Sequence, residues 1–279
     1  MLTPNQELNE TIVGTLARAQ KRSPVKICAL FFAGNHFHLI LDVDNAKQLT
    51  EFMQYASSNL AREVARITGW KQKIWGRRYQ GIICTTEEEA QTSRLAYVLR
   101  HGAKERLVRS PRLWPGVHCI DALITGEPLR GYWFDRTKEG AAKRRGEIFS
   151  RYDFATPETV VLSPLPCWRH LTPEAYRHRI ADLVQQIEAD AEREQRLGGW
   201  EPQGAEGVEA QNPLEAPARS KKSPAPDFHA ATKTALQALR EEYREFVAAY
   251  RQASAKYLAG DRLVPFPAGS FPPPMPYVE

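Results

Sequence analysis

The sequence predicts an α+β fold in which amphipathic helices alternate with short strands. Three observations support this prediction. A helical stripe of apolar residues comes first, two runs of strand-forming residues joined by a Gly-Asn turn follow it, and a longer amphipathic stretch comes next. Helices that alternate with paired strands in this order are typical of a layered arrangement, in which helices pack against a sheet.

The totals fit a folded protein with room for extensions. The chain has 279 residues, of which 42% are hydrophobic and 25% are charged, close to the averages for globular proteins. Its four cysteines lie far apart without a CxxC pair, which argues against a zinc ribbon or a disulfide framework. No apolar run approaches the roughly 18 residues of a transmembrane helix, and the N-terminus lacks the pattern of a signal peptide. We therefore expect a cytoplasmic protein with no membrane partner, whose net charge of +5 permits a polyanionic partner without requiring one.

The first elements are a helix and a strand pair. Apolar residues share one face of a predicted helix over residues 7–21, and strand formers fill residues 25–32 before the Gly-Asn turn. Residues 36–43 alternate in character. Their apolar face consists of Phe37, Leu39, Leu41 and Val43, and their other face of His36, His38, Ile40 and Asp42. This pattern predicts a half-buried strand that directs two histidines away from the core.

A second group of elements follows. A long helix is predicted from its buried stripe and from Gly69, which would end it. Residues 79–84 predict a short strand. Thr86 and Glu89 have the spacing of a capping box, which would open a helix that runs to about His101. The apolar stripe of the long helix consists of Leu49, Phe52, Met53, Ala56, Leu60, Val64 and Ile67.

The chain divides into five expected segments. They are a first domain over residues 1–125, a partly helical extension over 126–197, a linker over 198–227, a helix over 228–260 and a proline-rich tail over 261–279. Enrichment in Gly, Pro, Ala and Glu predicts a flexible linker. Apolar residues at helical spacing predict the helix after it, and the prolines predict an extended tail.

Two patterns bring histidines to places where they could carry chemistry. His36 and His38 are alternate residues of one strand, so their imidazoles share a face and are near enough to bind one divalent metal ion. Tyr97 and His101 are four residues apart on a helix and share a face there. Each pattern alone has an ordinary explanation, because surface strands carry histidine pairs by chance and helical tyrosines usually pack half-buried.

A basic and aromatic stretch lies between these two patterns. Cations that contact phosphates, interleaved with rings that stack on bases, suit single-stranded nucleic acid. A solvated loop anchored by its tryptophans accounts for the stretch equally well. The residues concerned are Trp70, Lys71, Lys73, Trp75, Arg77, Arg78 and Tyr79.

Several of these motifs occur together and in a characteristic order. Gly-Asn-His-Phe-His-Leu-Ile-Leu is followed by Ile-Trp-Gly-Arg-Arg-Tyr, by Leu-Ala-Tyr-Val-Leu and by Arg-Ser-Pro-Arg-Leu-Trp-Pro-Gly. The first motif is similar to the HUH signature, Pro-Asn-His-hydrophobic-His. With the others, it makes about residues 5–120 resemble the REP-associated tyrosine transposases and the related single-tyrosine HUH transposases of insertion sequences.

The resemblance implies an activity and a site. Tyr97 would be the nucleophile and His36 and His38 metal ligands, while His101 takes the place of a third ligand that is usually Asn or Gln. The implied reaction cuts and rejoins single-stranded DNA through a 5′-phosphotyrosine, with Mg²⁺ or Mn²⁺ as cofactor. Three imidazoles form a softer site, in which Mn²⁺, Zn²⁺ or Ni²⁺ competes better than usual. The expected DNA contacts are Lys71, Lys73, Trp75, Arg77 and Arg78.

The resemblance also implies a fold, partners and a location. The family has a ferredoxin-like antiparallel sheet with helices on one face, and its first strand precedes the first helix. This sequence begins almost directly with that helix, so we expect the sheet to lack its first strand and the chain to add a helical C-terminal extension. The expected partner is single-stranded or hairpin DNA in the bacterial cytoplasm, near the nucleoid, and a homodimer is left open.

Three alternatives are weighed against this interpretation. A histidine-triad nucleotide hydrolase needs a third alternating histidine, and Ile40 occupies that place. A replication initiator or relaxase shares the HUH chemistry, but no helicase-like segment is attached. The strongest alternative is a domesticated, inactive DNA-binding protein that recognises a hairpin without cutting it. Tyr97 favours the enzyme, and the absent first strand favours the binding protein.

Overall fold

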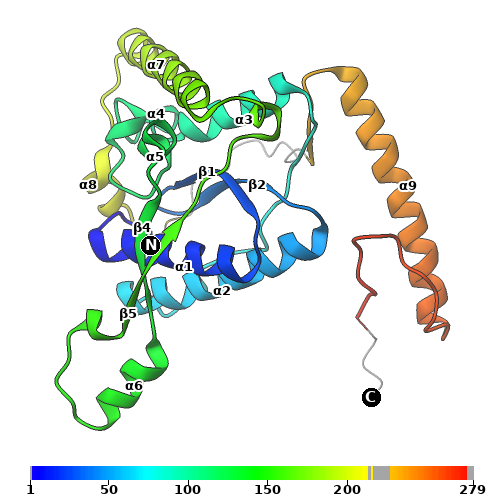
Figure 1. The fold of residues 1–279 in the computed structure, drawn as a ribbon, viewed down its shortest axis with the longest axis horizontal. Helices are drawn as coiled ribbons and strands as arrows, with labels where there is room; N and C mark the ends of the chain where they lie inside the picture. The colour runs from blue at the N-terminus through cyan, green and yellow to red at the C-terminus, as the bar shows by residue number, and fades with distance from the viewer. Residues whose placement is uncertain (1, 213–214, 216–226, 275–279) are drawn as a thin grey trace.

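The computed structural model describes residues 2–212, 215 and 227–274 and places helices around small β-sheets (Figure 1). The α-helices of this part are α1 (Gln6–Arg22), α2 (Ala46–Thr68), α3 (Glu88–Leu99), α4 (His101–Lys104), α5 (Ile120–Thr125), α6 (Arg136–Arg144), α7 (Pro173–Gly198), α8 (Gly204–Glu209) and α9 (Lys233–Leu258). The strands are β1 (Lys26–Phe32), β2 (Phe37–Asp42), β3 (Ile83–Cys84), β4 (Leu129–Phe134), β5 (Ala155–Val160) and β6 (Phe228–His229). The fold is therefore a mixture of α and β structure, as the sequence predicts.

The described strands form separate two-stranded sheets. β1 pairs with β2 and β4 with β5, both antiparallel, whereas β3 pairs with β6 in parallel. A ferredoxin-like sheet is not confirmed. The expectation of helices on one face is likewise not confirmed for β1–β2, because α1 and α2 lie on one side of this pair and α3 and α4 on the other (Figure 1). β1 is buried along its length except at Lys26, as a strand covered on both faces should be.

The first two helices form as their sequences predict. The Asn5 side chain accepts a hydrogen bond from the Leu8 backbone and caps α1, and Asn45 caps α2 in the same way. Gly69 ends α2 in the left-handed conformation at φ 68°, which glycine adopts without strain. The apolar faces of both helices pack into the core that contains β1, so these helices fix the strand pair from one side.

Two segments from later in the chain pair with the edge of β1 that does not face β2. The Phe32 backbone N–H donates to the carbonyl of Val117 at 2.8 Å, and the Ser163 N–H donates to the carbonyl of Ile27 at 2.8 Å. Backbone hydrogen bonds of this kind satisfy groups that would otherwise be buried without partners. Segments beyond residue 116 thus contribute to the sheet that carries the first histidines.

The β4–β5 hairpin lies directly against α1. A Cβ atom added at Gly14 would lie 2.0 Å from the carbonyl oxygen of Tyr132, and one added at Gly131 would lie 2.4 Å from that of Glu10. Only glycine permits helix and strand to approach so closely. The boundary that we expect at residue 125 stays a prediction, and these contacts run between the segments on its two sides.

Some local predictions are wrong for physical reasons. The capping box of Thr86 and Glu89 does not form, since α3 begins after Glu87. The Glu87 carboxylate instead accepts hydrogen bonds from the Ala231 backbone and the Thr232 hydroxyl. The strand predicted over residues 79–84 is reduced to its last two residues, which pair with β6. The structure before α3 therefore depends on the distant segment that contains β6, Ala231 and Thr232. No pattern within residues 79–89 could indicate this contact.

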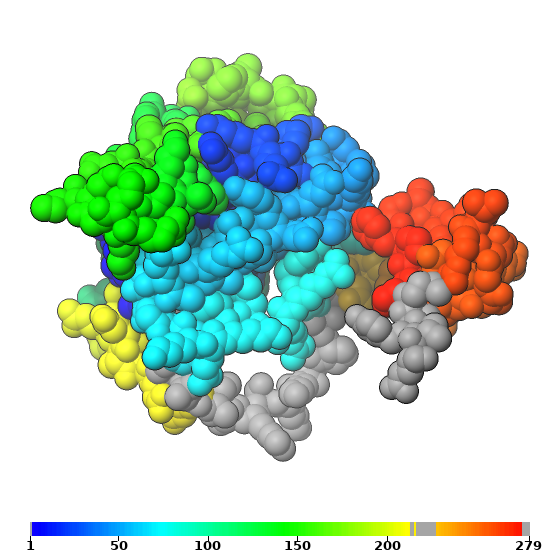
Figure 2. All heavy atoms as spheres, turned by 90° about the horizontal axis from the view of Figure 1, so that it is seen from below, coloured from blue at the N-terminus to red at the C-terminus, as the bar shows by residue number. Residues whose placement is uncertain are grey.

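The C-terminal elements also differ in detail from the prediction. His229, expected within the last helix, belongs to β6, and α9 begins at Lys233. The helix α8 lies inside the predicted linker, whose residues 213–214 and 216–226 lie outside the described part. α9 stands apart from the other helices, and residues 259–274 lie beside it (Figures 1 and 2). Along the described part of the chain, no helix is long and apolar enough to cross a membrane.

Candidate active site

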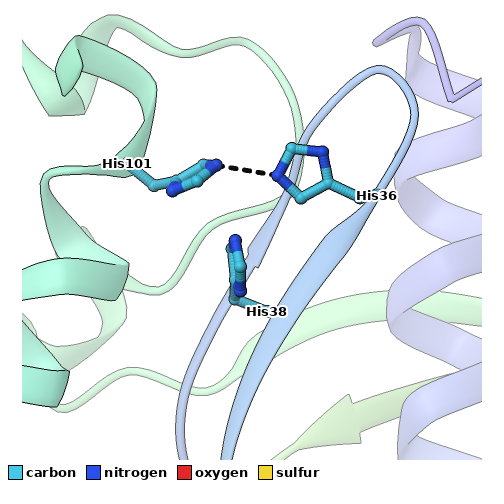
Figure 3. Close-up of side chains that lie close together, drawn as sticks. All are labelled: His36, His38 and His101. Carbon is cyan, nitrogen blue, oxygen red and sulfur yellow. Dashed lines mark hydrogen bonds between the residues drawn. The ribbon is translucent and has the colours of Figure 1, made fainter. Parts of the chain in front are cut away.

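Three histidines from separate elements converge at one point (Figure 3). His36 precedes β2, His38 lies on β2, and His101 begins α4. The ring centroids of His38 and His101 are 4.3 Å apart, those of His36 and His101 are 4.9 Å apart, and those of His36 and His38 are 5.1 Å apart. One nitrogen from each ring lies within 4.8 Å of the other two. The strand alternation and the helical position thus bring all three predicted ligands together.

Hydrogen bonds orient two of the rings. The Asn35 side-chain oxygen lies 2.6 Å from His36 Nδ1 and accepts a hydrogen bond from it, so the lone pair of the neutral ring lies on His36 Nε2. This nitrogen lies 2.8 Å from His101 Nε2 and accepts a hydrogen bond when that His101 nitrogen carries the proton. A ligand histidine whose second nitrogen is held by an oxygen is the usual arrangement at metal sites.

The three imidazoles are held in their neutral form. Burial, with smaller effects of His36 and Lys104, lowers the pKa of His38 to about 4. Burial, with the two neighbouring histidines and Lys104, lowers the pKa of His101 to about 3. Burial also lowers the pKa of His36, although Glu105 opposes the shift. Neutral imidazoles have free lone pairs, which metal binding requires.

The donor set fits a divalent metal ion. His38 points between the other two rings (Figure 3), and its buried Nε2 has no hydrogen-bond partner within the described part of the chain. A buried nitrogen of this kind needs a partner. Two nitrogens bonded to one ion at ~2.1 Å lie at most ~4.2 Å apart, so the observed 4.8 Å requires only a small adjustment. The residues present therefore fit such an ion.

Tyr97 lies beside this cluster. It is half-buried on α3, and its ring centroid is 5.5 Å from that of His38 and 5.6 Å from that of His101. The tyrosine and the strand histidines thus lie on the same side of the β1–β2 pair. A phenol hydroxyl and a metal-binding cluster at this separation can act on one substrate group.

Two cations that the sequence interpretation missed flank the Tyr97 ring. The Arg94 guanidinium carbon is 5.0 Å from the ring centroid, and Lys104 Nζ is 4.6 Å from it. The sequence could have indicated them. Arg94 lies three residues before Tyr97 and Lys104 seven residues after it, and residues at these spacings share one face of a helix. These side chains bring positive charge to a site whose imidazoles are neutral.

The predicted DNA contacts lie in the segment between α2 and β3. Lys71, Lys73, Arg77 and Arg78 are exposed. Trp75 is half-buried, its ring centroid lies 5.4 Å from that of Phe37, and its indole N–H donates to the Ser57 carbonyl at 2.8 Å. Because Phe37 alternates with the strand histidines, this tryptophan packs on the opposite face of β2. The contacts of these residues with DNA stay a prediction.

Comparison with known protein families gives a match to a transposase family. The family model described as "Transposase IS200 like" matches residues 3–100, a span that includes His36, His38 and Tyr97 and ends one residue before His101. Comparisons with curated proteins and with solved structures found no match. The match agrees with the family that the sequence motifs resemble. Residues 3–100, about a third of the chain, are therefore similar to the IS200-like transposase family.

Proposed function

We propose that this protein is a single-tyrosine nuclease and strand transferase, which cuts and rejoins single-stranded DNA with Tyr97 as the nucleophile. One observation carries the proposal. The Tyr97 ring lies 5.5 and 5.6 Å, between ring centroids, from two histidines of a three-imidazole cluster whose donor atoms fit a metal ion. The transposase family of residues 3–100 supports DNA as the substrate.

The chemistry is a transesterification at phosphorus. The Tyr97 oxygen attacks the phosphodiester, the bond from phosphorus to the 3′ oxygen breaks, and the 5′ phosphate stays on the tyrosine. The phenol loses its proton to water, and the leaving 3′ oxygen gains one. A divalent ion, when bound, supplies positive charge for the non-bridging phosphate oxygens. Because the phosphotyrosine conserves the bond energy, a 3′ hydroxyl of another strand can displace the tyrosine and join the DNA.

The ligands proposed for the metal are His36, His38 and His101, as expected from the sequence. All three present nitrogen, and the cluster contains no carboxylate. Nitrogen ligands bind Mn²⁺, Zn²⁺ and Ni²⁺ more strongly than Mg²⁺, which prefers oxygen. We therefore expect Mn²⁺ to support the reaction at lower concentrations than Mg²⁺ does.

The proposed substrate is single-stranded DNA that carries a hairpin. Lys71, Lys73, Arg77 and Arg78 offer exposed cations for its phosphates. Replacing Arg77 and Arg78 by Gln should weaken binding and flatten its salt dependence, since each phosphate contact releases counterions. An unchanged salt slope in this double variant would restrict the two arginines to a role in the fold.

A covalent adduct tests the proposed reaction. Labelled single-stranded DNA with hairpins of varied sequence is incubated with the protein and Mn²⁺, with or without chelator, and is separated on a denaturing gel. We expect an adduct that requires the metal and is lost in Tyr97→Phe, which removes only the attacking oxygen. Tyr243→Phe is the matched control, because Tyr243 is 45% exposed on α9 and should keep the adduct.

The histidines are tested in the same assay. His38→Ala should abolish the adduct through loss of the metal while DNA binding largely survives, and calorimetric titration with Mn²⁺ checks the first half of this statement. An adduct that persists in Tyr97→Phe would assign the nucleophile elsewhere. DNA binding without any adduct, in folded and metal-loaded protein, would favour the alternative of a DNA-binding protein that does not cut.

A further inference from the structure

The cations beside Tyr97 are placed there by the geometry of one helical face. Arg94 lies on α3 one turn before the tyrosine, and Lys104 ends α4, which follows α3 directly. The guanidinium carbon and Lys104 Nζ lie 5.0 and 4.6 Å from the same ring centroid. Two positive groups therefore flank one phenol ring, next to the three imidazoles.

Neither cation is neutralised by a close partner. Arg94 has no acidic partner among the residues that the structure describes, and its buried Nε has no hydrogen-bond acceptor there. Lys104 has one acidic neighbour, Glu105, at 3.7 Å, and both side chains are at least 40% exposed. Exposed pairs at such distances are weak. The two cations are thus free to take an anionic ligand.

A cation–π contact alone does not account for Arg94. Such a contact explains why a guanidinium lies near a ring, but it leaves the buried Nε–H without an acceptor, and an unsatisfied buried donor costs free energy. A phosphate group beside the guanidinium would pair with its charge. Arg and Lys are the side chains that bind phosphate most readily.

From these observations we infer that Arg94 and Lys104 form a phosphate-binding subsite, which holds a phosphodiester of single-stranded DNA against Tyr97. The inference rests on the proposed function for the identity of the ligand. It assigns charge recognition to α3 and α4, separately from the histidine cluster. The subsite works without the metal, because its charge comes from the Arg94 and Lys104 side chains.

Salt-dependent DNA binding tests this subsite. The full-length protein is titrated with a fluorescein-labelled oligothymidine in chelator at several NaCl concentrations, and binding is followed by anisotropy. Each lost phosphate contact lowers the slope of log K against log[NaCl] by about 0.7 for single strands. We therefore expect Arg94→Gln and Lys104→Gln together to lower the slope by about 1.4, the sum of two such contacts. Arg94→Lys, which keeps the charge, should lie closer to the parent than Arg94→Gln.

The matched control removes the same charge elsewhere. Lys143 and Arg144 are exposed on α6 and have no acidic partner in the described part of the chain, and their double substitution by Gln should leave the slope near that of the parent. A slope that is unchanged in the Arg94 and Lys104 variant, or is lowered equally in the control, would overturn the inference. If the double variant fails to fold, the exposed Lys104→Gln alone should lower the slope by about 0.7, and an unchanged slope would overturn the inference.

The binding test is separable from the test of the proposed reaction. It contains no metal and scores no cleavage, so its outcome does not depend on adduct formation. A lowered salt slope without any covalent adduct would support the phosphate-binding subsite and contradict the proposed nuclease activity. A covalent adduct with an unchanged salt slope would support the proposed nuclease activity and contradict the phosphate-binding subsite.

Discussion

The close contact of α1 with β4 gives the most direct test of how the chain is assembled. In Gly14→Ala the new methyl group would lie 2.0 Å from the carbonyl oxygen of Tyr132 and 2.2 Å from its carbonyl carbon. These are backbone atoms, and the strand that contains them is held on its other side by the ladder with β5. Helix and strand must therefore separate to admit the methyl group.

The expected magnitude combines two opposing effects. Overpacking costs up to ~3 kcal/mol of unfolding free energy, and we take the upper value because no flexible side chain can give way. Replacing a helical glycine by alanine regains ~1 kcal/mol. We expect a net loss of ~2 kcal/mol, which corresponds to a fall in Tm of roughly 4–8 °C for a chain of this size. Urea unfolding followed by circular dichroism measures it.

Gly140→Ala is the matched control. Gly140 also lies within a helix, α6, but a Cβ atom there would meet only the Arg144 side chain at 3.5 Å, an ordinary contact. This variant should gain up to ~1 kcal/mol from helix propensity alone. The two substitutions should thus have opposite signs. A Gly14→Ala variant as stable as Gly140→Ala would refute the packing of β4 on α1 and would favour an independent segment after residue 125.

Three further predictions concern charge, pH and metal choice. Glu158 is fully buried and pairs with the partly exposed Arg18 and Lys21. Replacing both cations by Met should lower the free energy of unfolding by about 3 kcal/mol, more than Glu158→Gln does. The reverse order in urea unfolding would contradict this. Burial lowers the pKa of His118, so its neutral form contributes stability that is present above pH ~6.5 and is lost as pH falls below it, by up to ~1.4 kcal/mol per unit. His118→Gln should flatten that dependence, and equal slopes would refute the assignment. His101→Gln should shift metal affinity from Zn²⁺ towards Mg²⁺, and an unchanged affinity ratio in calorimetry would remove His101 from the ligand set.

The candidate site could be predicted from sequence only in pieces. Strand alternation predicts that His36 and His38 share a face, and helical spacing predicts the same for Tyr97 and His101, because both patterns depend on local geometry. Nothing local relates the strand to the helix. Their convergence was expected from the resemblance to a family, and the structure supplies the centroid distances that define it.

The fold could be predicted where it depends on side-chain patterns, and could not be predicted where it depends on backbone hydrogen bonds between distant segments. Apolar stripes identified α1 and α2, and Gly69 identified the end of α2, since these signals lie in neighbouring residues. The pairing of Val117 and Ser163 with β1 uses backbone groups, which every sequence contains, so no side-chain pattern indicates it. The same holds for β6, whose arrival beside β3 shortened a predicted strand and displaced a predicted capping box.

The charge distribution at the site has a consequence for how metal and DNA bind. The pKa values of His36, His38 and His101 are all lowered, so at neutral pH the three imidazoles carry no positive charge and do not repel a cation. The side-chain charge beside Tyr97, the proposed nucleophile, comes instead from Arg94 and Lys104, which do not depend on a metal. A chelator should therefore abolish cleavage while it leaves much of the affinity for single-stranded DNA. Since protonated imidazoles do not bind metal ions, acid should weaken metal binding.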